Sequence, residues 1–194
     1  MAGGKEEFEA LGGKKLAYDY ELRYLPPYCR CRAALNADKY KHERKKWDPI
    51  FARQGEKGKD WMHLHHYCYG LIMLNRHSRG VGKPSALLRE AEAQINYVIT
   101  HSNPKFILMP ELHLKMGITQ KLMGKDSKAL QHFIQAIKLK KNYVPAYLHI
   151  ISYYKEHHDL KNAIKTAKRG LKYSPKSNML KKKLIEMQSL STTK

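Results

Sequence analysis

The chain has 194 residues, of which 42% are hydrophobic and 28% charged, and this is typical of a soluble globular protein long enough to bury a core. No stretch is long and apolar enough for a transmembrane helix, and the start, MAGGKEEFEALGGKK, lacks the apolar segment of a signal peptide. We therefore expect no membrane span and a cytoplasmic protein, or a periplasmic or otherwise exported one if this is a mature form.

Positive charge dominates the composition, with 37 lysines and arginines against 17 aspartates and glutamates and a net charge of +20. The excess lies at the C-terminal end, where residues 105–194 hold 19 basic and five acidic residues. Such a field attracts nucleic acid, anionic lipid headgroups or an acidic protein, and the charge alone does not choose among them.

Residues 1–59 predict an N-terminal extension without repeats. A short helix is expected in PPYCRCRAALN, which starts at Pro26. Residues 39–59 are rich in lysine and arginine, with loop signals at Asp48-Pro49 and between Gly55 and Gly58, and they are typical of an exposed charged segment.

Two helices are expected next, over residues 60–76 and 85–101. The first contains WMHLHHYCYG, with three histidines and a cysteine, and the second carries Ala91, Ile95 and Val98 on one face. The connection between them, HSRGVGKPS, is longer than the usual tight turn.

The C-terminal half repeats with a period of 34 residues. Ala129 recurs as Ala163 and Ala136 as Gly170, and the same step relates Leu112, Ala146 and Leu180. Within each period two amphipathic segments are separated by a turn, so helices are expected over 110–123, 127–139, 145–156, 160–172 and 178–189.

These features resemble the tetratricopeptide repeat family, in which small residues let the two helices of each 34-residue unit approach closely. The matching small residues are Gly70, Gly117, Ala129, Ala136, Ala163 and Gly170. The departures from the family pattern are Gln120, Lys141, Ile151 and Ala167. The resemblance implies an all-α, right-handed superhelix of about three helix pairs plus a C-terminal solvating helix, over residues 60–189, with a tail at 190–194.

The resemblance also implies a binding surface, because the first helix of each pair lines the concave side of such arrays. The residues at the exposed positions of these helices are Leu114, Ile118, Lys121, Leu148, Ser152 and Lys155, with Lys182 from the last helix. An apolar floor with a line of lysines suits an acidic or amphipathic protein segment. We therefore expect a non-catalytic adaptor or assembly factor without a cofactor, and a subunit of a larger complex is one form that it could take.

Three cysteines leave several arrangements open. Cys29 and Cys31 are too close to pair easily with each other, so either could bridge to Cys68 in an oxidising compartment, whereas all three would stay free in a reducing cytosol. The phrases LPPYC and HHYC resemble exported bacterial tetratricopeptide proteins, and this favours a bridge, which we assign to Cys29 and Cys68.

The alternatives to a protein-binding role are a metal or redox site and a nucleic-acid surface. His63 and His66 share a helix face, but His65 and Cys68 lie round the helix from them, so packed histidines are favoured over a metal site. The lysine clusters 138–141 and 181–183 could contact phosphate. No P-loop, GxSxG, HExxH or GxGxxG motif occurs, so an enzyme is not expected.

Overall fold

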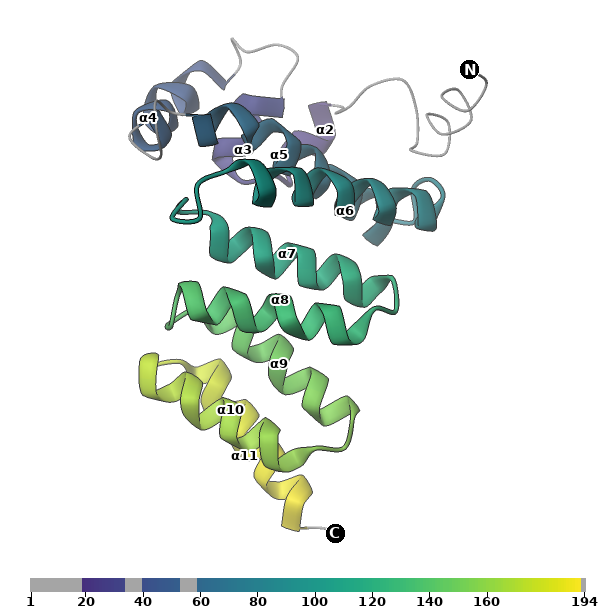
Figure 1. Ribbon diagram of the computed structural model, residues 1–194, viewed down its shortest axis with the longest axis vertical. Coiled ribbons are helices and arrows are strands. Elements are labelled where there is room, and N and C mark those ends of the chain that lie inside the picture. The colour runs from purple at the N-terminus through teal and green to yellow at the C-terminus, as the bar shows by residue number, and fades with distance from the viewer. Residues whose placement is uncertain (1–18, 34–39, 53–58, 193–194) are drawn as a thin grey trace. The chain divides into compact units, whose positions relative to one another are not determined.

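The computed structural model describes residues 19–33, 40–52 and 59–192 (Figure 1). Within these ranges the secondary structure consists of ten helices and no strand, so the all-α prediction is confirmed for this part of the chain. No helix among the described residues is both long enough and apolar enough to span a lipid bilayer. The chain divides into two compact units, Met1–Ile107 and Leu108–Lys194, which we call the first and second unit. The predicted boundary at residue 59, between the extension and the repeat region, stays a prediction.

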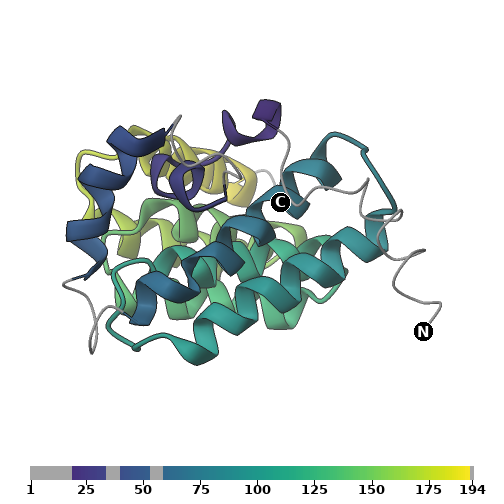
Figure 2. The same ribbon diagram turned by 90° about the horizontal axis from the view of Figure 1, so that it is seen from above.

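The first unit is built on a pair of antiparallel helices, α5 (Lys59–Ser78) and α6 (Pro84–His101), which lie side by side in Figures 1 and 2. They approach closely at Gly70, because a Cβ atom there would lie 2.8 Å from Ile95 Cγ1 and 3.4 Å from the Ala91 carbonyl oxygen. The connection turns through Gly80 and Gly82, whose φ angles of 67° and 85° suit glycine.

Three shorter helices precede α5, namely α2 (Asp19–Leu22), α3 (Pro27–Ala33) and α4 (Lys41–Ala52). The helices α3 and α4 pack against α5, and α2 packs against α3. The segment expected to be exposed and irregular is therefore partly helical, and α4 continues through Pro49. Tertiary packing explains the difference, because Phe51 is buried with its ring 5.8 Å from that of Tyr28 and 5.9 Å from that of Phe106. The loop signals between Gly55 and Gly58 lie outside the described residues.

The second unit consists of two helix pairs and a final helix. The pairs are α7 (Met109–Leu122) with α8 (Asp126–Leu139) and α9 (Val144–Glu156) with α10 (Leu160–Tyr173), and α11 (Asn178–Thr192) packs against α9 and α10. All five helices begin and end within three residues of the predicted bounds.

Small residues bring these helices together at the predicted repeat positions. A Cβ atom on Gly117 would lie 2.5 Å from the Phe133 ring and 3.0 Å from the Ala129 carbonyl oxygen, and one on Gly170 would lie 2.9 Å from Leu180. Gly117 thus meets Ala129 and Phe133 as Gly70 meets Ala91 and Ile95. The core enclosed by this packing includes Ala136, Ala146, Tyr147, Ile150, Ala163 and Ala167.

Candidate protein-binding surface

Six of the seven predicted binding residues lie on α7 and α9, the first helices of the two pairs in the second unit, and the seventh lies on α11. We call this surface of α7, α9 and α11 the first-helix face. Leu114 is only 6% exposed and belongs to the core, so it offers little area to a partner. Ile118 and Leu148 are half-buried against the same core, and the apolar floor is therefore narrower than expected.

Lys121 is held by a carboxylate of the next first helix. Its Nζ donates to both oxygens of Glu156, at 2.7 and 2.6 Å. The side chains are 31% and 51% exposed, so the ion pair is open to solvent on the first-helix face. Lys121 is already bound to the kind of group that an acidic partner would present.

Lys155 repeats this arrangement one period along the chain. Its Nζ donates to Glu186 Oε1 at 2.6 Å, and Lys183 donates to Glu186 Oε2 at 2.7 Å. The hydrogen bonds from Lys155 and Lys183 hold the pKa of the Glu186 carboxyl below its ordinary value. The carboxylate is therefore charged at neutral pH. Each of the two predicted lysines, Lys121 and Lys155, is thus paired with a glutamate of the same chain.

The sequence pattern did not single out Glu156 and Glu186, although a signal for one of them was present. Residue 156 is equivalent to residue 122 of the preceding repeat, which is the neighbour of Lys121 in the sequence. When the two first helices stack, Glu156 therefore lies beside Lys121. With only five acidic residues in 105–194, two carboxylates on this face take up much of the local negative charge.

The remaining predicted residues are accessible. Ser152 is half-buried on α9 and Lys182 is exposed on α11. A cavity of about 210 Å³, lined by Lys155, His158, Leu160 and Leu190, lies where the ends of α9 and α11 meet the start of α10. It gives the face an apolar hollow next to a cation.

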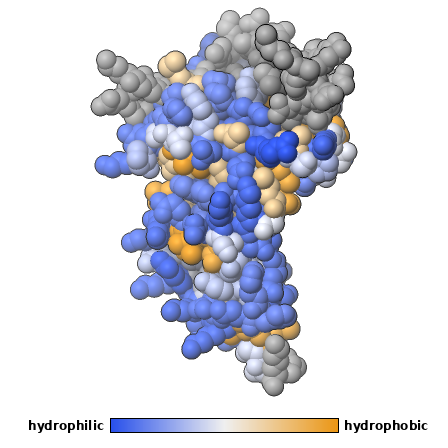
Figure 3. Space-filling view, turned by 45° about the vertical axis from the view of Figure 1, so that its right-hand side comes forward, coloured by the Kyte–Doolittle hydropathy of each residue, from blue (hydrophilic) through white to orange (hydrophobic). Residues whose placement is uncertain are grey.

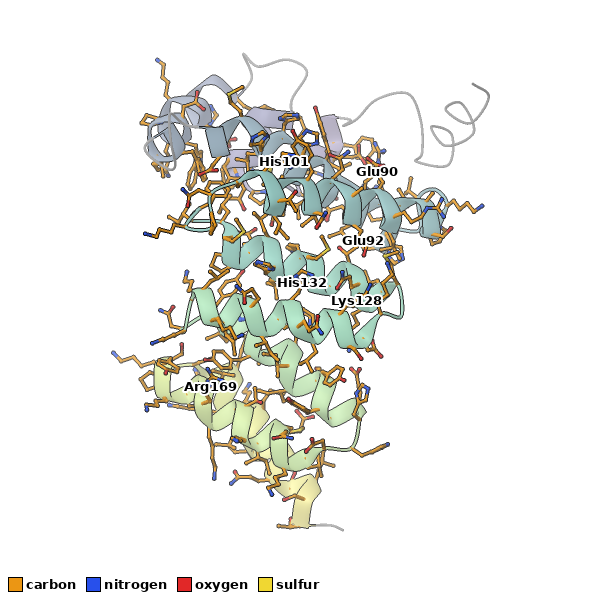
Figure 4. All side chains as sticks on the ribbon, viewed as in Figure 1. Glu90, Glu92, His101, Lys128, His132 and Arg169 are labelled. Atoms are coloured by element: carbon orange, nitrogen blue, oxygen red, sulfur yellow. A yellow bond between two sulfur atoms is a disulfide. The ribbon has the colours of Figure 1, made fainter. Side chains whose placement is uncertain are left out.

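Half-buried histidines border the face. The ring of His149 stacks on Phe133 with centroids 4.8 Å apart, and burial, followed by the nearby Lys121 and Lys115, lowers the pKa of His149. His113 on α7 and His132 on α8, the latter labelled in Figure 4, share a hydrogen bond between their Nδ1 atoms at 2.9 Å. One of the two rings must donate and the other accept, so at least one of them is neutral.

In the first unit, each histidine of WMHLHHYCYG has a contact within the protein. His66 Nδ1 shares a hydrogen bond with Gln94 Oε1 at 2.5 Å, His65 Nδ1 one with the Met62 carbonyl oxygen at 2.7 Å, and His63 packs edge-on against Tyr97. Burial, followed by the charges of His101 and His66, lowers the pKa of His63. Among the described residues no group of three or more histidine, cysteine, aspartate or glutamate side chains is placed to hold a metal ion.

The structure joins Cys29 of α3 to Cys68 of α5 in a disulfide, with both residues fully buried. A second link lies nearby, where Arg76 donates to both carboxylate oxygens of Glu21 at 2.7 and 2.9 Å. These two links attach the N-terminal extension to the first helix pair. The Cys31 side chain lies outside the described part of the chain.

In comparisons with known proteins, the chain matches no family model, and no curated protein matches it at a significant level.

Proposed function

We propose that the protein is a non-catalytic adaptor or assembly factor of the tetratricopeptide type, in which the second unit binds an acidic or amphipathic segment of a protein partner. The segment lies along the first-helix face and contacts α7, α9 and α11 in turn. The close approach of helices at Gly70, Gly117 and Gly170 supports the repeat architecture.

One observation carries the proposal. Lys121 and Lys155 stand 34 residues apart, and each holds a carboxylate contributed by the next first helix. Two equivalent lysines on successive helices are thus oriented to bind carboxylates. Since the exposed pairs contribute little stability, a partner carboxylate can replace Glu156 or Glu186 at small cost.

The apolar groups on this face set the second requirement for the partner. Ile118 and Leu148 provide a narrow floor, and the cavity of about 210 Å³ beside Lys155 accepts one apolar side chain. A segment with carboxylates interleaved with leucine-sized residues meets both requirements.

The disulfide bears on where this function takes place. The buried Cys29–Cys68 disulfide supports an oxidising compartment as the proposed location, because disulfides persist there. This supports the exported alternative over a cytoplasmic location.

A displayed library of random peptides tests the binding proposal. The purified full chain should enrich acidic peptides, and Lys121→Gln/Lys155→Gln should weaken their binding about tenfold, the effect of about 1.4 kcal/mol. Glu156→Gln/Glu186→Gln should strengthen binding instead, because the lysines lose their internal competitors. The matched control is Lys45→Gln/Lys83→Gln, which removes two exposed charges from the first unit. Equal shifts from the lysine and control pairs, or a loss of binding from the glutamate pair, would contradict the proposal.

A further inference from the structure

The outer side of α10 carries a row of five cations. Within its residues Leu160–Tyr173 they are Lys161, Lys165, Lys168, Arg169 and Lys172, and all five are exposed. At 100° per residue these positions fall on one side of the helix, opposite the buried Ala163, Ala167 and Gly170. Figure 4 labels Arg169 on this helix. We call this row the α10 basic face.

The charge of this face is not neutralised by ion pairs. From Leu160 to Ile185 the sequence holds nine lysines and arginines and no aspartate or glutamate. In the described part of the chain no carboxylate lies within ion-pair distance of any of the five cations, whereas Lys121, Lys155 and Lys183 all have one. The five cations of α10 therefore form a row without ion pairs among the described residues, on a helix that is not part of the first-helix face.

We propose that the α10 basic face docks the protein on an anionic phospholipid surface, by electrostatic attraction to the lipid headgroups. The inference goes beyond the proposed function and does not depend on it, because α10 is a second helix of its pair and contributes none of the seven predicted binding residues.

The chemistry of the face favours lipid over the other polyanions. A protein interface of any strength needs apolar or aromatic anchors, and the outer side of α10 has none. A surface for single-stranded nucleic acid needs exposed aromatic rings for stacking, and Tyr173, the only aromatic residue of α10, is half-buried beside the Lys141 ammonium. Lysine suits a headgroup layer, because its compact charge on a long flexible stem needs no fixed geometry.

On the side of the molecule that Figure 3 shows, the lower part of the surface is mostly hydrophilic, with small separate hydrophobic areas. The α10 basic face consists of exposed cations and suits adsorption to headgroups rather than insertion among acyl chains.

Co-sedimentation with vesicles tests the proposal, using the unreduced full chain at physiological salt. Vesicles of phosphatidylcholine with an increasing fraction of phosphatidylglycerol are compared with phosphatidylcholine alone. Binding should rise steeply with the anionic fraction and fall with added salt. The quadruple variant Lys161→Gln/Lys165→Gln/Lys168→Gln/Lys172→Gln should lose roughly several hundredfold in partition coefficient, since each lysine near an anionic surface contributes about fivefold. All four side chains are exposed, so the variant should unfold at the same temperature as the original chain.

A matched variant with the same net charge separates this face from the charge of the whole protein. Lys45→Gln/Lys83→Gln/Arg89→Gln/Lys105→Gln removes four exposed cations from the first unit and should bind vesicles nearly as well as the original chain. Equal losses from the two quadruple variants would overturn the proposal, as would no binding to anionic vesicles. A third arm uses duplex DNA at matched phosphate concentration, and tighter binding to DNA than to vesicles would overturn the assignment to lipid.

Discussion

The two units of the chain are built from similar helix pairs, but different kinds of interaction stabilise the inside of each unit. In the second unit the exposed lysine–glutamate pairs of Lys121 and Lys155 recur 34 residues apart, and Gly117 and Gly170 let neighbouring helices approach closely. In the first unit one helix pair is covered by short helices, and single cross-links hold them: a disulfide, a buried ion pair and an aromatic cluster. Periodic packing stabilises a segment that repeats, whereas a segment that does not repeat depends on unique links.

The largest expected effect is in the buried ion pair of the first unit. Arg76 and Glu21 are 2% and 4% exposed, so Arg76→Met leaves a buried carboxylate without its guanidinium. We expect a loss of about 3–5 kcal/mol in the free energy of unfolding, measured by urea denaturation. Lys121→Met is the control in the second unit, where an exposed pair contributes at most about 1 kcal/mol. Similar losses in the two variants would remove the distinction between the units.

Reduction of the disulfide should have the next largest effect, again confined to the first unit. Closing a loop with a separation of 39 residues stabilises the folded chain by about 2–4 kcal/mol. Cys29→Ser/Cys68→Ser should lower the unfolding midpoint accordingly, and hydrogen exchange should rise in α3 and α5 but not in α9 and α10. The unreduced, denatured chain should titrate one thiol out of three. Three titratable thiols would show that the link does not form.

The period explains why the second unit is easier to predict than the first. Each of its helices repeats a pattern that occurs elsewhere in the chain, so the small residues Gly117 and Gly170 indicate both the helices and their contacts from the amino-acid sequence alone. The Lys121–Glu156 pair is not evident from the sequence, because the groups that neutralise a surface charge depend on the side-chain directions of two helices. The repeat position of Leu114 predicts an exposed side chain, but the side chain is buried, and the reason is the same.

The first unit depends on contacts between segments that share no pattern. The charge of residues 39–59 and the presence of Pro49 indicate an exposed segment, but Phe51 packs against Tyr28 and Phe106 from distant parts of the sequence, and α4 forms around it. Glu21 and Arg76, which are 55 residues apart, give no sign of their ion pair in the sequence. Only the cysteines indicate a link between the extension and α5, and by spacing alone they leave two pairings open.

A smaller effect is expected where a glycine lets two helices approach closely, a feature that both units share. Gly117→Ala places a methyl group 2.5 Å from the buried Phe133 ring, and Gly70→Ala places one 2.8 Å from Ile95. Overpacking costs about 1–3 kcal/mol, partly offset by about 1 kcal/mol from the better helix propensity of alanine. Both variants should therefore lose stability in thermal denaturation. Phe133→Leu should cost less in the Gly117→Ala background than alone, and full additivity would mean that the two side chains do not compete for the same space.

The smallest effect is a pH dependence that belongs to the second unit. Burial, followed by the charge of His132, lowers the pKa of His113 from 6.5 to about 4. The unfolded chain therefore binds a proton at higher pH than the folded one, so the contribution of His113 is fully present above pH 6.5 and is lost as the pH falls towards 4. Because the ring is partly exposed, we expect a loss on the order of 1 kcal/mol, less than the shift alone would give. Urea denaturation at several pH values should show the free energy of unfolding decreasing as the pH falls from 6.5 towards 4. His113→Gln should make this pH dependence weaker. A slope that persists in His113→Gln would assign the titration to another half-buried imidazole, and His149 is the next to test because burial lowers its pKa as well.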